Sequence, residues 1–338
     1  MIESIEFKNF KALRDTTLPL GRFTLIVGPN GSGKSTALQA LGALRRNQCK
    51  PSEFQRLASA GIAQAREEVA IVVHWNTPNG KVLLKARWDP TNARAYDCLI
   101  RQNRRLNPSD QAVLRKEKDA IRVYSLDAKL IAAPIQLTPG VELGQDGAGL
   151  VGVLDRLRDE EPERFKALNG ELGRWLPEFD QILFDTPGPG TRAFSLRMRE
   201  GHHKISAREV SQGTLLALAI LTLAYLPDPP AIVGFEEPDR GLHPRLLRDV
   251  QDALYRLSYP ENYGEDREPV QVIATTHSPY FLDLFRDHPE EVVIASKAGQ
   301  EATFERLTDR PDCEEILRDA HLGDLWYSGI LGGVPSEP

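Results

Sequence analysis

The chain has 338 residues, enough for one large domain or two of ordinary size. Its hydrophobic content of 41% and charged content of 27% are typical of a globular protein with a sizeable core. The formal net charge of −6 argues against general nucleic-acid binding, so any contact with DNA requires a local basic patch. Three scattered cysteines form no C-x-x-C pair, which excludes zinc hooks and zinc ribbons and fits a reducing compartment.

Hydrophobic periodicity and turn signals predict four strands and two helices in the first ninety residues. The turn Asn79-Gly80 lies between two apolar runs and indicates a β-hairpin. The predicted strands cover residues 2–7, 23–27, 69–73 and 82–86, and the predicted helices cover 35–44 and 53–68.

The nine residues after the strand 23–27 form a complete phosphate-binding loop. They read Gly28-Pro29-Asn30-Gly31-Ser32-Gly33-Lys34-Ser35-Thr36, which satisfies the pattern G-x-x-x-x-G-K-[ST]. Glycines let backbone N–H groups turn inward around phosphates, a lysine supplies a point charge, and a serine hydroxyl ligates Mg²⁺. The strand before the loop and the helix after it are the expected context. The sequence therefore predicts a site for a nucleoside triphosphate.

The middle of the chain is mainly helical in pattern. Residues 94–122 carry eight arginines or lysines against four acids, which indicates either a solvated helix pair or a path for DNA. Helices are predicted over 146–158 and 162–175, and strands over 181–184 and 193–197, with the turn 187–190 between the strands.

Three features of the second half carry chemistry suited to a nucleotide. The apolar strand 231–235 ends in Glu236-Glu237, and paired carboxylates can hold Mg²⁺ and activate water. The strand 270–275 is followed by His277. Ser211 and Gly213 open an apolar helix over 215–226, whose free N–H groups attract anions.

The order of these motifs resembles the ATPase heads of the ATP-binding-cassette (ABC) class, in the RecF/SMC/OLD-like branch. The resemblance spans nearly the whole chain. It is carried by Phe10-Lys11, 28–36, 211–214, 236–244, 275–279 and, more weakly, 146–154.

The resemblance implies the role of each site residue. Lys34 and the catalytic pair Glu237 and His277 would act on ATP. The nucleotide would contact Asn30, Gly31, Ser32, Gly33, Lys34, Ser35 and Thr36 of one copy and Ser211, Gly213 and Asp239 at the dimer interface. Mg²⁺ would bind Ser35 and Glu236, although Glu236 stands where the family has aspartate, and Gln212 also departs from the family pattern. The glutamine of the family's switch loop is unassigned, with Gln136 and Gln48 as candidates.

The resemblance also implies an α/β fold of the P-loop NTPase class, an ABC-type head with a mixed sheet and an inserted helical lid. We expect a nucleotide-binding lobe over 1–89, a mainly helical insert over 90–175, and the remaining motifs in 176–338. No apolar stretch reaches the length of a membrane span and the first residues lack a signal peptide, so we expect a cytoplasmic protein without a membrane partner.

The leading functional hypothesis is an ATP-hydrolysing switch that dimerises around ATP and controls DNA repair or defence against phage. About 60 residues follow His277, too few for the nuclease domain of OLD-like proteins, so we expect a separate effector such as a nuclease. Double-stranded DNA is a second candidate partner. One alternative is a scaffold or sensor that holds ATP with little turnover. A transporter ATPase subunit is a weaker alternative, because 210–214 departs from the transporter signature.

Overall fold

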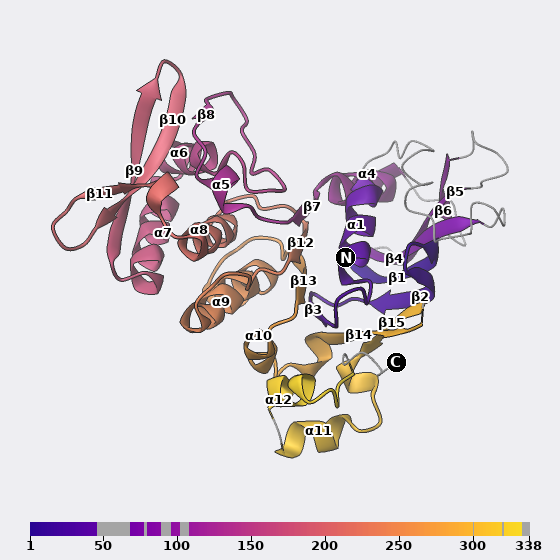
Figure 1. The fold of residues 1–338 in the computed structure, drawn as a ribbon. Helices are drawn as coiled ribbons and strands as arrows, with labels where there is room; N and C mark the ends of the chain where they lie inside the picture. The colour runs from indigo at the N-terminus through magenta and orange to yellow at the C-terminus, as the bar shows by residue number, and fades with distance from the viewer. Residues whose placement is uncertain are drawn as a thin grey trace. The chain divides into compact units, whose positions relative to one another are not determined.

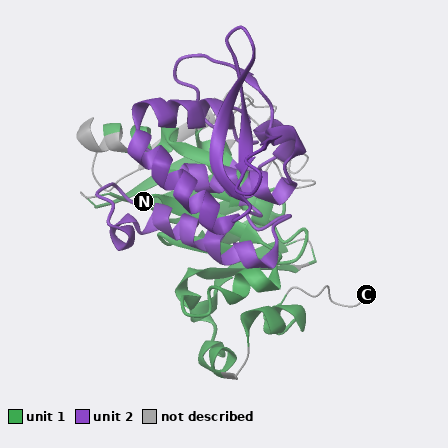
Figure 2. Cartoon of the chain, turned by 90° about the vertical axis from the view of Figure 1, so that its left-hand side faces the viewer, with its two compact units in different colours: residues 1–123, 230–235, 270–338 green, residues 124–229, 236–269 purple. Residues whose placement is uncertain are grey.

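A computed structural model describes most of the chain and divides it into two compact units. The described residues are 1–45, 68–77, 80–88, 96–101, 108–299, 301–319 and 321–332. Unit 1 comprises residues 1–123, 230–235 and 270–338, and unit 2 comprises 124–229 and 236–269 (Figure 2). Among the described residues, no helix combines the length and the apolar character needed to cross a membrane.

Unit 1 contains an antiparallel sheet of five strands in the order β2-β1-β4-β5-β6. The strands are β1 (Ile2–Phe10), β2 (Leu13–Pro19), β4 (Val69–Thr77), β5 (Gly80–Trp88) and β6 (Tyr96–Arg101). Thr77 pairs with Gly80, which confirms the predicted hairpin.

A mixed sheet of six strands has the order β15-β14-β3-β13-β12-β7. The strands are β3 (Phe23–Val27), β7 (Ile121–Tyr124), β12 (Ile232–Glu236), β13 (Gln271–Thr276), β14 (Val292–Ala298) and β15 (Glu301–Arg306) (Figure 1). The central strand β3 pairs in parallel with both β13 and β14, and β15 returns antiparallel to β14. All five residues of β3 are buried, as its continuous apolar run predicts.

One hydrophobic cluster joins both sheets of unit 1 to α1 (Lys34–Arg45). It includes Phe7 of β1, Leu38 and Leu41 of α1, and Ile273 of β13. The buried amide of Gln271 links the sheets directly. Its Nε2 donates to the carbonyl oxygens of Ile2 at 2.7 Å and Gly21 at 2.8 Å, while its Oε1 accepts from the Ile2 N–H at 2.8 Å. Each polar atom of this buried side chain thus has a partner.

Four more helices belong to the described part of unit 1. Helix α4 (Pro108–Asp119) precedes β7, and α10 (Pro279–Asp283), α11 (Cys313–Asp319) and α12 (Leu322–Tyr327) follow β13. Helix α12 packs on α10, and the Gly323 N–H donates to Asp283 Oδ1 at 2.7 Å. Leu322 and Leu331 are fully buried. The C-terminal residues 321–332 therefore pack against the rest of unit 1.

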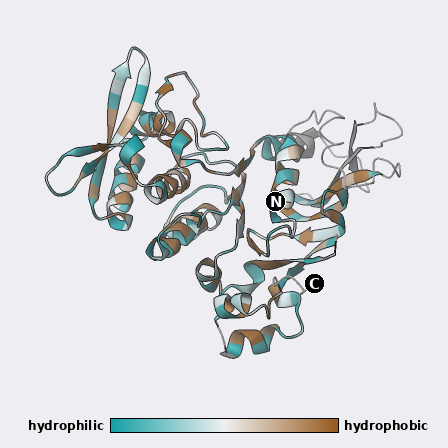
Figure 3. Cartoon of the chain, in the orientation of Figure 1, coloured by the Kyte–Doolittle hydropathy of each residue, from teal (hydrophilic) through white to brown (hydrophobic). Residues whose placement is uncertain are grey.

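Unit 2 packs helices against a small four-stranded sheet. Its helices are α5 (Ala128–Ile131), α6 (Leu150–Glu160), α7 (Pro162–Trp175), α8 (Gln212–Ala224) and α9 (Leu247–Ser258), and its strands are β8 (Ile135–Gln136), β9 (Phe179–Gly188), β10 (Thr191–Met198) and β11 (Lys204–Ser206). Every residue of α8 from Thr214 to Ala224 is buried, in keeping with its apolar sequence (Figure 3).

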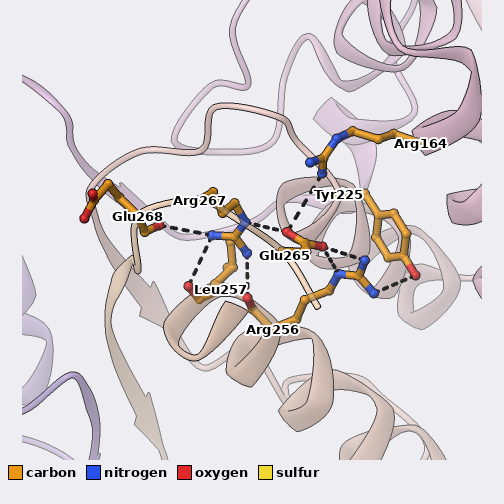
Figure 4. Close-up of polar contacts among 7 residues, drawn as sticks. All are labelled: Arg164, Tyr225, Arg256, Leu257, Glu265, Arg267 and Glu268. Carbon is orange, nitrogen blue, oxygen red and sulfur yellow. Dashed lines mark hydrogen bonds and ion pairs between the residues drawn. The ribbon is translucent and has the colours of Figure 1, made fainter. Parts of the chain in front are cut away.

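A buried carboxylate with three arginines around it holds the chain beyond α9. Glu265 accepts hydrogen bonds from Arg256 Nε and Arg267 Nε, both at 2.6 Å, and lies 3.9 Å from Arg164 Nη1 (Figure 4). Arg256 Nη1 also donates to the Tyr225 hydroxyl at 3.2 Å. Burial alone would raise the pKa of Glu265, but the hydrogen bonds and charges of Arg267 and Arg256 outweigh it and hold the pKa below the ordinary range.

Two sequence predictions are wrong in the middle of the chain. Within the described part of the basic stretch, residues 96–101 form strand β6, which pairs with β5, and residues 108–119 form a helix, so the stretch is not the predicted helix pair. The helix predicted from 146 begins at Leu150, since the preceding residues form a turn that ends at Gly149 with φ of 86°. The helix predicted over 53–68 and the candidate Gln48 lie outside the described residues, apart from Glu68.

The division of the chain at residues 89 and 175 stays a prediction. The compact units divide elsewhere, at 123/124, 229/230, 235/236 and 269/270.

Candidate nucleotide-binding site

The phosphate loop leaves β3 at the carboxyl end of the central strand and leads directly into α1. Gly31 and Gly33 have φ of 77° and 93°, a region that other residues rarely adopt. Gly28 faces the neighbouring strand so closely that an added methyl group would lie 2.4 Å from the carbonyl oxygen of Ala295. The three glycines are therefore required by backbone conformation and by packing.

The loop buries its inner side chains and exposes its outer edge. Lys34 is 5% exposed, and its ammonium donates to the carbonyl oxygens of Gly28 at 2.7 Å and Pro29 at 2.9 Å. Ser32 is fully buried, and its Oγ has no hydrogen-bond partner among the described residues. Asn30, Gly31 and Ser35 are exposed, and Thr36 is half-buried.

This geometry fits a phosphate group. The exposed rim lies at the N-terminus of a 12-residue helix, where free N–H groups and the helix dipole attract anions. Because glycine leaves the exposed rim without a side chain at Gly31, phosphate oxygens can approach the backbone there.

His277 is brought to the loop by strand register. Thr276, the last residue of β13, pairs with Val27, the last residue of β3, in a parallel ladder. Gly28 and His277 therefore leave the sheet at adjacent positions on the same edge. His277 is half-buried. The structure thus brings together His277 and the phosphate loop, which are about 240 residues apart in sequence.

The carboxylate pair lies where β12 ends. Glu236 is the last residue of the strand, and Glu237 begins a turn in which the Arg240 N–H donates to the Glu237 carbonyl at 3.0 Å. Glu237 has φ of 48°, an uncommon conformation for a residue with a side chain. Asp239 lies in the same turn and is half-buried. A strained, non-glycine residue at a predicted catalytic position is a pointer to function.

The start of α8 in unit 2 is exposed to solvent. Ser211 caps the helix, since its Oγ accepts from the Thr214 N–H at 3.2 Å. Ser211 and Gln212 are exposed, whereas Gly213 abuts the turn after β12: a methyl group there would lie 2.7 Å from the Gly241 carbonyl oxygen. The helix N-terminus is therefore free to meet another molecule.

The structure also gives the position of Gln136 and bears on side-chain clusters that could hold a metal ion. Gln136, a candidate for the switch-loop glutamine, lies in β8 of unit 2, and its Nε2 donates to Thr191 Oγ1 at 2.8 Å. Among the described residues, no group of three histidine, cysteine, aspartate or glutamate side chains is placed to hold a metal ion.

The hairpin of β14 and β15, which packs against the phosphate loop, was not predicted from the sequence. Ala295 approaches Gly28, and a methyl group at Gly33 would lie 3.3 Å from Cβ of Ala302. The apolar run 292–295 followed by Gly299 was the available signal, but nothing local links it to residues 28–33.

A family model described as "AAA domain, putative AbiEii toxin, Type IV TA system" matches residues 23–283. The chain belongs to this family, AAA_21. The match spans the phosphate loop, the start of α8, the carboxylate pair and His277, so every candidate site residue lies within the AAA domain.

A curated relative supports the same assignment. The chain is 26% identical over 328 residues to the OLD nuclease of Thermus scotoductus (strain ATCC 700910 / SA-01), covering 85% of this chain and 60% of the relative. The chain thus spans about three fifths of that relative's length.

Solved structures show the fold. An SMC head bound to the C-winged helix domain of ScpA matches with a TM-score of 0.61 at 14% identity, covering 90% of this chain and 96% of that one. An SMC head with a coiled coil and joint from Pyrococcus yayanosii matches with a TM-score of 0.53 at 11% identity, covering 94% and 99%. These likenesses confirm the resemblance to ABC-type ATPase heads of the RecF/SMC/OLD branch, and the fold is the predicted P-loop NTPase fold with a mixed sheet.

Proposed function

We propose that the chain binds and hydrolyses Mg-ATP and acts as a switch by dimerising around the nucleotide. The observation that carries this proposal is the phosphate loop, with its two left-handed glycines and its lysine turned onto the loop carbonyls. Membership of a family of P-loop ATPases supports ATP as the nucleotide.

The residues of the loop have distinct roles in this proposal. Lys34 leaves the loop carbonyls and binds the β- and γ-phosphates, while backbone N–H groups of residues 30–36 bind phosphate oxygens. Ser35 and Glu236 are the proposed Mg²⁺ ligands, and such a sparse protein ligand set suits an ion that keeps several waters. Mg²⁺ neutralises charge on the phosphates when it is bound with ATP.

Glu237 is the proposed general base for the attacking water, and His277 is the proposed sensor of the γ-phosphate. The left-handed backbone at Glu237 supports this role, because strain of this kind persists where a particular side chain is needed. The register of β3 and β13 supports the role of His277, since it leaves the sheet beside the phosphate loop.

The exposed start of α8 supports an ATP sandwich between two copies. Ser211 and Gly213 would face the γ-phosphate of the partner copy, with Asp239 at the interface. A helix N-terminus prefers the charge of a γ-phosphate, so hydrolysis would weaken the dimer. The switch would control a DNA-directed process, in repair or antiviral defence, through a separate effector. The name of the OLD nuclease relative supports a nuclease effector, with double-stranded DNA as a further candidate partner.

The solution mass of Glu237→Gln, measured by light scattering, tests this proposal. We expect a dimer with Mg-ATP and a monomer with Mg-ADP, with ATP turnover at least about 100-fold below wild type because the base is lost. Lys34→Ala is the matched control, and it should stay monomeric with both nucleotides. An identical mass in both states would reject the sandwich and favour a scaffold that holds ATP.

A further inference from the structure

A second lysine lies at the exposed rim of the phosphate loop. Lys297, on β14, places its Nζ 3.7 Å from the position that a side-chain carbon would take at Gly31. Gly31 is itself exposed, and so is Lys297. An ammonium group therefore stands at the part of the loop that is open to a ligand.

The alternation of side chains along a strand places Lys297 on the face of β14 that packs against the phosphate loop. Residues two apart in a strand share a face. Ala295, two residues earlier, contacts Gly28, and Ala302, which pairs with Lys297 on β15, approaches Gly33. Ser296 lies on the opposite face, where a methyl group at Gly332 would lie 3.2 Å from its Oγ. Of these three described hairpin residues on the side of the loop, Ala295, Lys297 and Ala302, only Lys297 carries a charge.

The two lysines at the loop, Lys34 and Lys297, differ in burial and in hydrogen bonding. Lys34 is buried and is held by two backbone carbonyls, whereas Lys297 is exposed. Among the residues that the structure describes, no carboxylate forms an ion pair with Lys297. A triphosphate carries several negative charges, and one lysine leaves most of them without a protein cation.

We propose that Lys297 is a further nucleotide-binding residue, which donates a charge-assisted hydrogen bond to a phosphate oxygen of the nucleotide at the loop. This inference rests on the proposed function, since it needs ATP at residues 28–36. It assigns to β14 a part in binding that the motifs of the sequence do not indicate.

Mg-ATP titrations of Lys297→Gln, followed by calorimetry, test the inference. We expect the affinity to fall about tenfold, because a hydrogen bond between charged groups is lost. Lys297→Arg keeps the charge and should bind within about threefold of wild type. The matched control is Lys81→Gln, since Lys81 is also exposed in unit 1 but pairs with Glu3 at 2.7 Å on the five-stranded sheet. It should change the affinity by less than about twofold.

Chemical labelling gives a second readout that needs no variant. Acetylation by an N-hydroxysuccinimide ester forms an amide at an accessible lysine amine and releases N-hydroxysuccinimide. We expect Mg-ATP to protect Lys297 from this reaction and to leave Lys81 unprotected, as measured by mass spectrometry. Wild-type affinity in Lys297→Gln, or equal labelling of Lys297 with and without Mg-ATP, would overturn the inference. If wild type itself binds no Mg-ATP, the proposed function fails instead.

Discussion

Two loops that follow strands of the six-stranded sheet adopt left-handed backbone, but they do so with different residues. After β3, the phosphate loop places glycine at its left-handed positions, Gly31 and Gly33. After β12, the left-handed position is occupied by Glu237, with φ of 48°. Glycine adopts this conformation without steric cost, whereas a residue with a side chain loses about 1–2 kcal/mol.

In the proposed function, the phosphate loop binds through its backbone, whereas Glu237 acts through its side chain. In the phosphate loop the absence of side chains leaves backbone N–H groups accessible, so glycine is the best residue. At Glu237 the left-handed backbone fits the proposed need for a carboxylate at that place. Adding a side chain to a glycine of the phosphate loop should therefore impair nucleotide binding. At Glu237 the proposed activity should depend on which side chain is present.

The largest effect is expected for Gly28→Ala. Its methyl group would lie 2.4 Å from the Ala295 carbonyl oxygen and 2.6 Å from Ser32 Oγ, so β14 or the loop must move. We expect loss of Mg-ATP binding and a decrease of about 3 kcal/mol in the free energy of unfolding, measured with urea.

Gly42→Ala is the matched control for this variant. Gly42 lies within α1, and an added methyl group there meets no atom within 4 Å. Since alanine is the better helix former, the control should gain about 1 kcal/mol and retain binding. Normal ATP binding by Gly28→Ala would contradict the close packing between the loop and β14.

A smaller, pH-dependent effect is expected in unit 2 for Glu265→Gln. The substitution leaves Arg256 and Arg267 without their shared carboxylate, so at pH 7 it should cost about 2 kcal/mol. The pKa of Glu265 is lowered from 4.5 in the folded state, so its stabilisation is full above that value and is lost as the pH falls through the folded pKa.

Urea unfolding of wild type and Glu265→Gln from pH 7 to pH 3 measures this difference. The gap between the two proteins should be widest at pH 7 and should narrow below pH 4.5. Glu200→Gln, at an exposed turn, should show little difference from wild type at any pH. A gap that does not change with pH would mean that the charge of Glu265 does not stabilise unit 2.

The smallest expected effect is the difference in stability between glycine and alanine variants at Glu237, which tests the backbone strain of that loop. Because φ at Glu237 favours glycine, Glu237→Gly should be about 1 kcal/mol more stable than Glu237→Ala. At Glu236, within regular β12, the order should reverse, with alanine more stable by about 0.5–1 kcal/mol. Equal stabilities of the two Glu237 variants in urea would show that the backbone there is unstrained.

Much of the structure of the first ninety residues could be predicted from patterns among residues adjacent in sequence. The phosphate loop, the buried strand 23–27, the helix that follows, and the hairpin of β4 and β5 depend on residues adjacent in the chain. Motif order further indicated the family, and the family model confirms it across residues 23–283. Where short-range patterns were weak, as at β6, the sequence indicated the wrong element.

Tertiary structure alone decided which distant residues meet at the loop. The register of Thr276 with Val27 brings His277 beside Gly28, and the hairpin of β14 and β15 brings Lys297 beside Gly31. It also decided the left-handed backbone of Glu237 and the charges around Glu265. The physical reason is that strand pairing and side-chain packing join residues far apart in sequence, whereas propensity and turn chemistry act only over a few neighbours.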